Sequence, residues 1–320
     1  MSLLSICIPT YNRKERLIAQ LESLSSQNGI ESVPVIISDN GSDYSVENEV
    51  LPLFSGRLDL RRERFNVNTS VVVNISSCFL YGQTEWVWIL GDDDETLPGA
   101  VEKIVEDIKN VHSRIVMIKY SLDNAGFHPN EDEEVESFEE FAGHYKKAVS
   151  THPECGSLIA GDCAFCSTCV IRRSMLDDIA YTAFFYGYNQ LAFMVPVLFS
   201  FGKGFAIRFS SHKIVRYISP EVGGHWSLLS FMLGLCTWRD MPLSASEKDK
   251  KWFVRFMSAM IPIKLIMSEC LHSYGENPDY ARYVLGKIMR ECYQLSFFGR
   301  LRQWIRYYKR EMRLRRRRSC

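Results

Sequence analysis

The sequence lacks a net charge, because 38 lysine and arginine side chains balance 38 aspartate and glutamate side chains. Its ten cysteines in 320 residues are too sparse for a small disulfide-stapled scaffold. Its first residues contain no basic segment followed by a long apolar one, so we expect no secretion signal and a reducing, cytoplasmic setting. With 46% hydrophobic and 24% charged residues, the composition is that of an ordinary globular protein.

Long uncharged apolar runs are scarce as well. The longest, residues 180–202, is long enough to raise the question of a membrane span. It contains Asn189, Gln190 and Pro196 together with several glycines and tyrosines. We therefore predict a buried helical region here and no spanning helix.

The charge balance hides a segregation along the chain. Residues 300–318 contain ten lysines or arginines and one acid, Glu311, whereas residues 1–299 contain 28 basic and 37 acidic side chains. The body of the protein is thus acidic and its tail strongly basic. Such a tail indicates a surface or a partner rather than a feature of the fold.

Apolar runs alternate with amphipathic ones over the first 120 residues. Strands are expected at residues 3–9, 33–39, 57–66, 86–90 and 114–120, and helices at residues 13–27, 68–82 and 97–110. This alternation predicts an α/β fold, Rossmann-like, with a mostly parallel sheet covered by helices on both faces.

Three polar clusters follow three of these strands. They are PTYNR at residues 9–13, SDNGSD at residues 38–43 and GDDDE at residues 91–95. Ligands of open parallel sheets bind at the carboxyl ends of the strands. One crevice can therefore be lined by all three clusters.

The consecutive aspartates Asp92, Asp93 and Asp94 have two interpretations. Acids before a helix commonly cap its free amides and complement its dipole. Three like charges in one turn repel each other, however, and a cation would neutralise them. Carboxylate oxygens favour Mg²⁺ or Mn²⁺, which often share their coordination with substrate phosphates. We therefore expect Mn²⁺ or Mg²⁺ as the cofactor and a diphosphate as its partner.

Four segments in register resemble the family-2 glycosyltransferases with the GT-A fold: SICIPTYNR, IISDNGSD, NVNTSVVVNISSCF and WILGDDDETLPGA. The resemblance is specific over residues 2–110 and weaker to about residue 220. It implies a GT-A domain, which we place at residues 1–225, and we expect residues 226–320 to form a helical extension. It also implies an enzyme that moves a hexosyl or deoxyhexosyl group from a nucleotide-diphosphate donor to a glycan. A likeness to the branch that decorates bacterial O-antigen units suggests an acceptor linked to polyprenyl diphosphate.

The resemblance implies a role for each residue that matches a family motif. Residues placed near the base, ribose or diphosphate of the donor are Pro9, Thr10, Tyr11, Asn12, Arg13, Asp39, Ser42, Arg64, Asn66 and Asp92. Taken alone, Asn12 can be explained as a helix cap, Asp39 as a turn former and Arg64 as a solvated strand residue.

The metal motif departs from the family pattern, which usually has an aspartate where this sequence has Gly91. Alignment on the LP pair that follows puts Asp93 at the metal-binding position, with Asp94 after it and Asp92 toward the ribose or the metal. A shift of one residue makes Asp92 and Asp94 the pair instead. His225, in a glycine-rich loop, is a further candidate ligand of the metal.

The acid that deprotonates the acceptor in this family has no counterpart at the matching place, which reads YGYNQLAF. Asp178, or its neighbour Asp177, is one replacement, and Asp162 is another. A stereochemical outcome other than simple inversion is a third explanation. The residues expected to contact the acceptor are Asn189, Gln190 and Trp226.

A second metal hypothesis comes from Cys163, Cys166 and Cys169, whose C-x2-C-x2-C spacing occurs in iron–sulfur proteins. The fourth nearby cysteine that a cluster needs is missing, although His152 and Cys155 could join a zinc site. The apolar surroundings favour buried structural thiols instead.

The basic tail mixes its cations with aromatic and aliphatic residues, which is the composition of a helix lying on an anionic membrane. A solvated basic helix and a nucleic-acid-binding segment are the alternatives, and we do not expect nucleic acid as the partner. The sequence thus predicts a metal-dependent glycosyltransferase, peripheral at the inner face of the cell membrane. The competing hypothesis is an inactive nucleotide-sugar-binding protein that keeps the fold.

Overall fold

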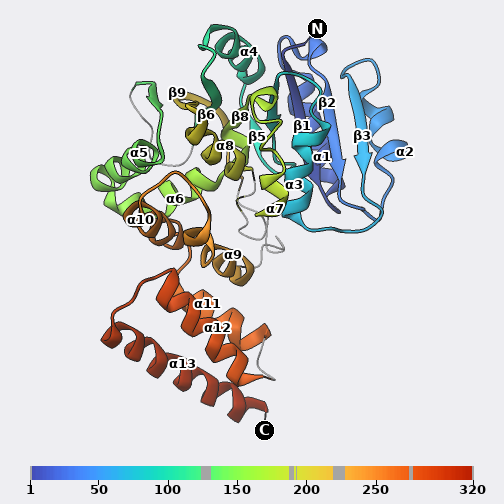
Figure 1. The fold of residues 1–320 in the computed structure, drawn as a ribbon. Coiled ribbons are helices and arrows are strands. Elements are labelled where there is room, and N and C mark those ends of the chain that lie inside the picture. Colours follow the sequence, from blue (N-terminus) through green and yellow to red (C-terminus); the bar gives the residue numbers. More distant parts are fainter. Residues whose placement is uncertain are drawn as a thin grey trace. The chain divides into compact units, whose positions relative to one another are not determined.

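The computed structural model describes residues 2–123, 131–186, 191, 193–218, 228–273 and 277–318, without the side chains at 311 and 313–318 (Figure 1). The chain divides into two compact units. One comprises Met1–Gly224 with Leu243–Ala245, and the other His225–Pro242 with Ser246–Cys320. The first unit contains the sheet and the second is helical.

The sheet of the first unit has nine strands among the described residues, in the order β3-β2-β1-β4-β8-β6-β9-β5 with β7 paired to β9. Their bounds are β1 Leu4–Thr10, β2 Val35–Asp39, β3 Leu60–Arg64, β4 Trp86–Ile89, β5 Glu95–Thr96, β6 Ile115–Leu122, β7 Glu133–Val135, β8 Cys169–Ile171 and β9 Ala206–Arg216. Strands β3, β2, β1 and β4 are parallel, as are β6 and β9. Strand β8 runs antiparallel to both β4 and β6. The predicted α/β fold with a mostly parallel sheet is confirmed.

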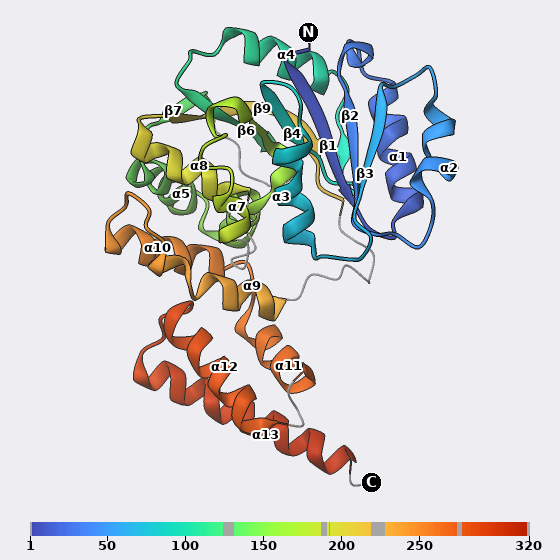
Figure 2. The same ribbon diagram turned by 45° about the vertical axis from the view of Figure 1, so that its right-hand side comes forward.

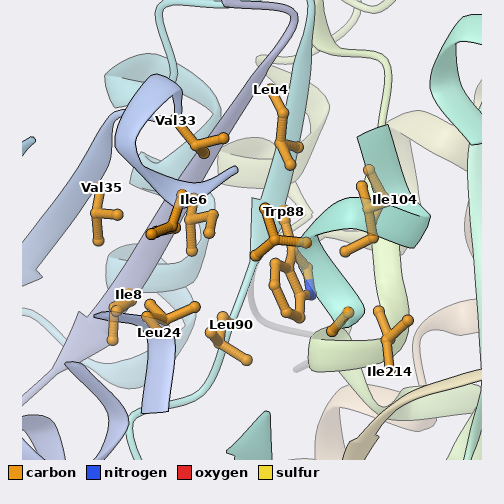
Figure 3. Packing of buried hydrophobic residues seen from close by; sticks show 14 of the residues in the cluster. Leu4, Ile6, Ile8, Leu24, Val33, Val35, Trp88, Leu90, Ile104 and Ile214 are labelled. Carbon is orange, nitrogen blue, oxygen red and sulfur yellow. The ribbon is translucent and has the colours of Figure 1, made fainter. Parts of the chain in front are cut away.

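Helices cover both faces of the sheet (Figure 2). Helices α1 (Lys14–Ser25), α2 (Val46–Glu49) and α4 (Ala100–Asn110) pack on the face to which β1 turns its even-numbered residues. Figure 3 shows Leu24 of α1 and Ile104 of α4 beside Ile8 and Trp88 of the sheet. Helix α3 (Val71–Tyr81) packs against β1 and β2 from the opposite face.

This packing holds in place the strands that lead to the polar clusters. Leu4, Ile6 and Ile8 of β1 and Trp88 of β4 are fully buried. Burying one such aliphatic side chain stabilises the folded state by about 1.5–3 kcal/mol. The carboxyl ends of β1 and β4 are therefore rigidly placed next to each other.

The helix predicted over residues 97–110 begins later in the structure, at Ala100. Residues 95–96 form the short strand β5, which pairs with β9, and Gly99 adopts a left-handed φ of 79° before α4 begins at Ala100. Glycine adopts this conformation without strain, so it separates strand from helix within a few residues.

The described part of the first unit also has α-helices between β7 and β9. It contains α5 (Phe138–Thr151), α6 (Gly156–Ala164), α7 (Thr182–Phe185) and α8 (Met194–Ser200). Within the apolar run 180–202, α8 buries Val195, Val197 and Leu198. No helix in the described ranges combines the length and the apolar character needed to cross a membrane.

The second unit contains α9 (Leu228–Leu235), α10 (Glu247–Ser258), α11 (Ile263–Ser273), α12 (Pro278–Glu291) and α13 (Phe297–Arg318). Ser246 caps α10 by accepting from the amide of Asp249, and Asn277 caps α12 just before a proline at its first position. Pro262 separates α10 from α11, as its missing amide donor requires. The basic tail forms most of α13.

Candidate active site

The three polar clusters meet because their strands are neighbours. Strands β2, β1 and β4 are parallel and adjacent, so residues 9–13, 38–43 and 91–95 leave the same edge of the sheet. The amide of Asn40 donates to the carbonyl of Thr10 at 3.0 Å, and the Thr10 hydroxyl donates to Asp92 Oδ2 at 2.7 Å. One residue of β1 thus touches both of the other clusters.

One arginine bridges two of the three aspartates. Arg13 Nη1 lies 3.0 Å from Asp92 Oδ1 and 2.7 Å from Asp93 Oδ2. Burial, reinforced by the charge of Asp93, raises the pKa of Asp92 to about 6, while Arg13 and Thr10 act in the opposite direction. The side chain of Asp93 is 26% exposed and that of Asp92 only 5%. Asp93 is therefore the more accessible carboxylate of the bridged pair.

Asp94 has a different partner. Its Oδ2 accepts a hydrogen bond of 2.5 Å from the hydroxyl of Ser167, in the turn Cys166–Thr168 that precedes β8. Burial is the main reason why the pKa of Asp94 rises to about 7. The hydrogen bond from Ser167 opposes this rise, and the charges of Asp93 and Asp92 add to it.

Close contacts around residue 91 explain why a glycine stands at the start of the acidic turn. A β-carbon at residue 91 would lie 2.6 Å from Asp94 Oδ2 and 3.2 Å from Ser167 Oγ. Any larger residue would therefore displace the Asp94 carboxylate from its hydrogen bond. The presence of glycine where the family usually has an aspartate is therefore linked to the position of the Asp94 carboxylate.

Two side chains that sequence analysis did not single out hold this turn. The Ser167 hydroxyl, which donates to Asp94, also accepts from the amide of Gly91 at 2.9 Å. The Ser167 carbonyl accepts from the Trp88 indole at 2.7 Å. Gln20 of α1, which is buried, donates to the carbonyl of Gly91 at 3.1 Å. In the sequence, Gln20 could have been noticed only as a polar residue beside the apolar stripe of α1. No local pattern in the sequence pointed to Ser167.

The second cluster forms a rigid loop around Asp39, which is fully buried. Asp39 Oδ1 accepts from the amide of Ser42 at 2.9 Å, and Oδ2 accepts from Arg64 Nη1 at 2.7 Å. Arg64 Nη2 also donates to the carbonyl of Ser42 at 2.7 Å. Both oxygens of Asp39 therefore serve to hold the loop and Arg64 in place.

The first cluster is locked to the second by Asn12. Its side chain donates to Asp43 Oδ2 at 2.9 Å and accepts from the amide of Asp43 at 2.7 Å, while its backbone amide donates to Ser42 Oγ at 3.0 Å. Asn12 has a φ of 53°, a left-handed conformation that asparagine tolerates better than most residues. Its neighbours Pro9 and Tyr11 are half-buried, and Asn66 is exposed after β3.

Residues 5–179, more than half of the chain, match the sequence model of "Glycosyl transferase family 2". The chain belongs to this family. Over 95 residues it is 33% identical to "Abequosyltransferase RfbV" of Salmonella typhimurium, a match that covers 29% of this chain and 28% of that protein. Over 128 residues it is 29% identical to an uncharacterized glycosyltransferase of Haemophilus influenzae, covering 39% and 42% respectively. The matched segments thus span less than half of these relatives.

Solved structures extend the similarity to the fold of most of the chain. S. aureus TarS 1–349 in complex with UDP-GlcNAc has a TM-score of 0.56 at 12% identity, covering 91% of this chain and 89% of that one. The mannosyltransferase PcManGT from Pyrobaculum calidifontis, in complex with GDP-Man and Mn²⁺, has a TM-score of 0.50 at 10% identity, covering 92% and 88%. The predicted GT-A fold is confirmed.

The acids considered as the base of this family-2 glycosyltransferase have lysine partners. Asp162 of α6 is buried, with its Oδ1 3.4 Å from Lys119 Nζ, and Lys119 also bonds Thr168. Asp178 is on the surface and forms an ion pair with Lys203. Among the hydrogen bonds and ion pairs of the described residues, none joins either acid to the aspartate turn.

Several of the family-derived predictions fall outside the described residues. They are the candidate metal ligand His225 and the candidate acceptor contacts Trp226, Asn189 and Gln190.

The three cysteines at the C-x2-C-x2-C spacing are free and lie in surroundings that disfavour the thiolate form. Burial raises the pKa of Cys166 to about 12 and that of Cys169 to about 11, and it raises the pKa of Cys163 further still. Metals bind the thiolate, which such burial disfavours. Among the described residues, there is no group of three or more His, Cys, Asp or Glu side chains placed to hold a metal ion.

Replacing Asp94 with asparagine is expected to stabilise the metal-free protein above neutral pH. The pKa of Asp94 lies above its usual value of 3.8 in the folded state, so the stability that protonation provides is lost as the pH rises through about 7. The asparagine side chain would keep an acceptor for the Ser167 hydroxyl without the buried charge. The free energy of unfolding should favour the variant by on the order of 2–4 kcal/mol at about pH 8, and the difference should shrink toward about pH 5.

Urea denaturation in the presence of a chelator, repeated across this pH range, measures the effect. Glu95→Gln is the matched control, because Glu95 is a neighbouring but exposed acid that pairs with Arg216. A difference between the Asp94→Asn variant and the wild type that stays constant with pH would contradict the prediction.

Proposed function

We propose that this chain transfers a hexosyl or deoxyhexosyl group from a nucleoside-diphosphate sugar, with Mn²⁺ or Mg²⁺, to a glycan acceptor. The observation that carries the proposal is the meeting of three strand-end loops at the acidic turn, where Arg13 bridges Asp92 and Asp93. Membership of the family makes transfer of a sugar the reaction to expect.

The donor would lie along the edge formed by the first and second clusters. Asp39 and Arg64 keep the second loop rigid, and Asn12 joins it to the end of β1. A preformed loop of this kind binds a ligand without first losing conformational freedom. We assign Pro9, Thr10, Tyr11, Asn12, Arg13, Asp39, Ser42, Arg64, Asn66 and Asp92 to the base, ribose and diphosphate.

The acidic turn offers a hard divalent cation suitable donor chemistry, although its carboxylates are not grouped as a ligand set in the described structure. Its donors are carboxylate oxygens, and the guanidinium of Arg13 already occupies a bridging position between two of them. Asp93, as the accessible member, would hold the metal, with Asp94 and His225 as further candidate ligands. A bound Mn²⁺ or Mg²⁺ would supply charge neutralisation for the departing diphosphate.

The residues of the turn have separate tasks in this proposal. Thr10 and Arg13 orient Asp92 and Asp93, and Ser167 fixes Asp94. Transfer breaks the bond between the anomeric carbon and the phosphate oxygen, so negative charge develops on the leaving diphosphate, where Arg13 adds a second positive charge. Asp162 and Asp178 remain candidates for the base that accepts the acceptor's proton.

The acceptor is proposed to be a lipid-linked glycan of bacterial surface polysaccharide, such as O-antigen. The similarity to an abequosyltransferase of Salmonella typhimurium supports this class. A catalyst for a lipid-linked acceptor would work at the inner face of the cell membrane, and the basic residues 300–318 suit attraction to anionic lipid there.

A thermal-shift panel of UDP, GDP, dTDP, CDP and CMP, each with and without Mn²⁺, tests the donor site. A ligand at about 100 times its Kd stabilises the folded protein by about 2.7 kcal/mol, so a selective shift is measurable without knowing the acceptor. One diphosphate is expected to raise the melting temperature only with Mn²⁺. Absence of a shift with every nucleotide would contradict the proposal.

An inactive protein that binds nucleotide sugars is the second candidate function. Gly91, in place of the family's aspartate, is the observation that favours it. The test uses the sugar nucleotide whose diphosphate raises the melting temperature in the panel. An enzyme should slowly release free sugar from it with metal and without acceptor, whereas a binding protein should not.

A further inference from the structure

Helix α13 carries a stripe of apolar side chains that are exposed to solvent. The stripe comprises Phe297 (67% exposed), Phe298 (78%), Leu301 (46%), Ile305 (49%), Tyr308 (44%) and Met312 (55%). At about 100° of rotation per residue, these six positions fall within an arc of about 100° on one side of the helix. A continuous exposed stripe of this length marks an interaction surface rather than scattered surface residues.

A different side of α13 packs against its own unit. Tyr307 is fully buried, and Trp304 comes so near α12 that a β-carbon on Gly286 would lie 3.5 Å from its ring. Arg310 donates to Ser268 of α11 at 2.8 Å. The core-facing side of the helix is therefore already occupied, and the apolar stripe is a second, separate face.

Cations border the stripe on its other side. Arg302, Arg306 and Lys309 are exposed and follow the stripe residues in the helical rotation. The helix thus presents, in order around its axis, a packed face, an apolar face and a basic face.

The neighbouring helix α12 contacts the stripe at Tyr308 and carries exposed aromatic rings of its own. Tyr280 and Tyr283 of α12 are 45% and 62% exposed, and Arg282 between them places its guanidinium 5.4 Å from the ring centre of Tyr308. Tyrosine suits the headgroup level of a bilayer, because its ring is apolar and its hydroxyl is polar.

We propose that α13 lies in the plane of an anionic bilayer, with the stripe from Phe297 to Met312 inserted between the acyl chains and headgroups. Arg302, Arg306 and Lys309 would then contact lipid phosphates. The geometry of α13 carries the surface itself, and only the reason for having it, a lipid-linked acceptor, rests on the proposed function. The inference goes beyond a basic tail near a membrane because it assigns binding to apolar insertion by named residues.

Charge favours lipid over the other occupants of such a face. A second copy of the chain, docked stripe to stripe, would bring the bordering cations of both copies together. A nucleic acid would pair with Arg302 and Arg306 but would leave the apolar stripe in water. An anionic membrane satisfies the apolar and the basic face at once.

The test is co-sedimentation of the full chain with vesicles of phosphatidylcholine, with and without phosphatidylglycerol. We expect binding to the anionic vesicles that is at least about tenfold stronger than to the neutral ones. The double variant Leu301→Glu with Ile305→Glu should lower binding to anionic vesicles by at least about tenfold. The matched control is Leu53→Glu, which changes a leucine 54% exposed in the first unit and should leave binding unchanged.

The outcomes separate the inference from its alternatives. Equal vesicle binding by the double variant and the wild type would overturn insertion and leave a purely electrostatic tail. A wild type that fails to bind vesicles but dimerises in solution, with a monomeric double variant, would overturn it in favour of self-association. Donor-induced thermal shifts should be the same in the wild type and in all variants. Failure of the wild type to bind anionic vesicles, with these shifts intact, therefore refutes this inference alone. Intact vesicle binding without any shift refutes the donor proposal alone.

Discussion

Replacing Asp93 with alanine is expected to lower the rate of sugar transfer by about 10²–10³-fold or more, the loss typical of removing one group that stabilises charge in a transition state. Asp93 is the exposed member of the pair bridged by Arg13, so it is the carboxylate that a metal-bound diphosphate can reach. Asp92 keeps its contacts to Thr10 and Arg13 in the variant, and the fold should therefore be preserved.

Two measurements make this prediction specific. The affinity for Mn²⁺ in the presence of the nucleoside diphosphate, measured by calorimetry, should fall together with the turnover rate. Glu95→Gln removes an acid two positions later, on β5, that pairs with Arg216 instead, and it should leave both quantities unchanged. Loss of turnover in Asp93→Ala with normal Mn²⁺ affinity would contradict the assignment of Asp93 as the ligand.

The substitution Lys119→Met is expected to destabilise the first unit by about 3–5 kcal/mol, the usual result of leaving a buried charge without its partner. Lys119 is 2% exposed on β6, and the carboxylate left behind would be that of Asp162, 9% exposed on α6. Adding Asp162→Asn should restore most of the lost stability, because the second charge is then removed as well. Urea denaturation of the two single variants and the double variant measures the coupling.

The same set of variants decides the role of Asp162. If Asp162 only balances Lys119, the activity of the double variant will follow its restored stability. If Asp162 is the base that deprotonates the acceptor, the double variant will remain folded while its rate stays lower by about 10²–10⁴-fold. A double variant no more stable than Lys119→Met would contradict the charge-pair argument itself.

Local patterns in the sequence were enough to locate the parallel half of the sheet. The runs that became β1, β2 and β4 are short, apolar and followed by turn-forming residues, which are signals that depend on neighbours in the chain. Because parallel strands end at one edge, the positions of Thr10, Asp39 and Asp92 around a common site followed from the order of the elements.

What the sequence did not predict depends on contacts between distant residues. Strand β8 enters the sheet antiparallel between β4 and β6, and this insertion brings Ser167 to Asp94, 73 positions earlier in the chain. The three cysteines around Ser167 were considered for their spacing, yet the serine between them makes the contact. Likewise, the pairing of β5 with β9 joins segments that share no local signal.

The contact between Gly91 and Asp94 also constrains how this site can change by mutation. A single substitution that restores an aspartate at position 91 would place its β-carbon 2.6 Å from Asp94 Oδ2, against the carboxylate held by Ser167. Position 94 would have to become smaller first, or change at the same time. The two positions are therefore expected to vary as a pair among descendants of this sequence, and the order of the two steps decides whether the intermediate protein keeps a working acidic turn.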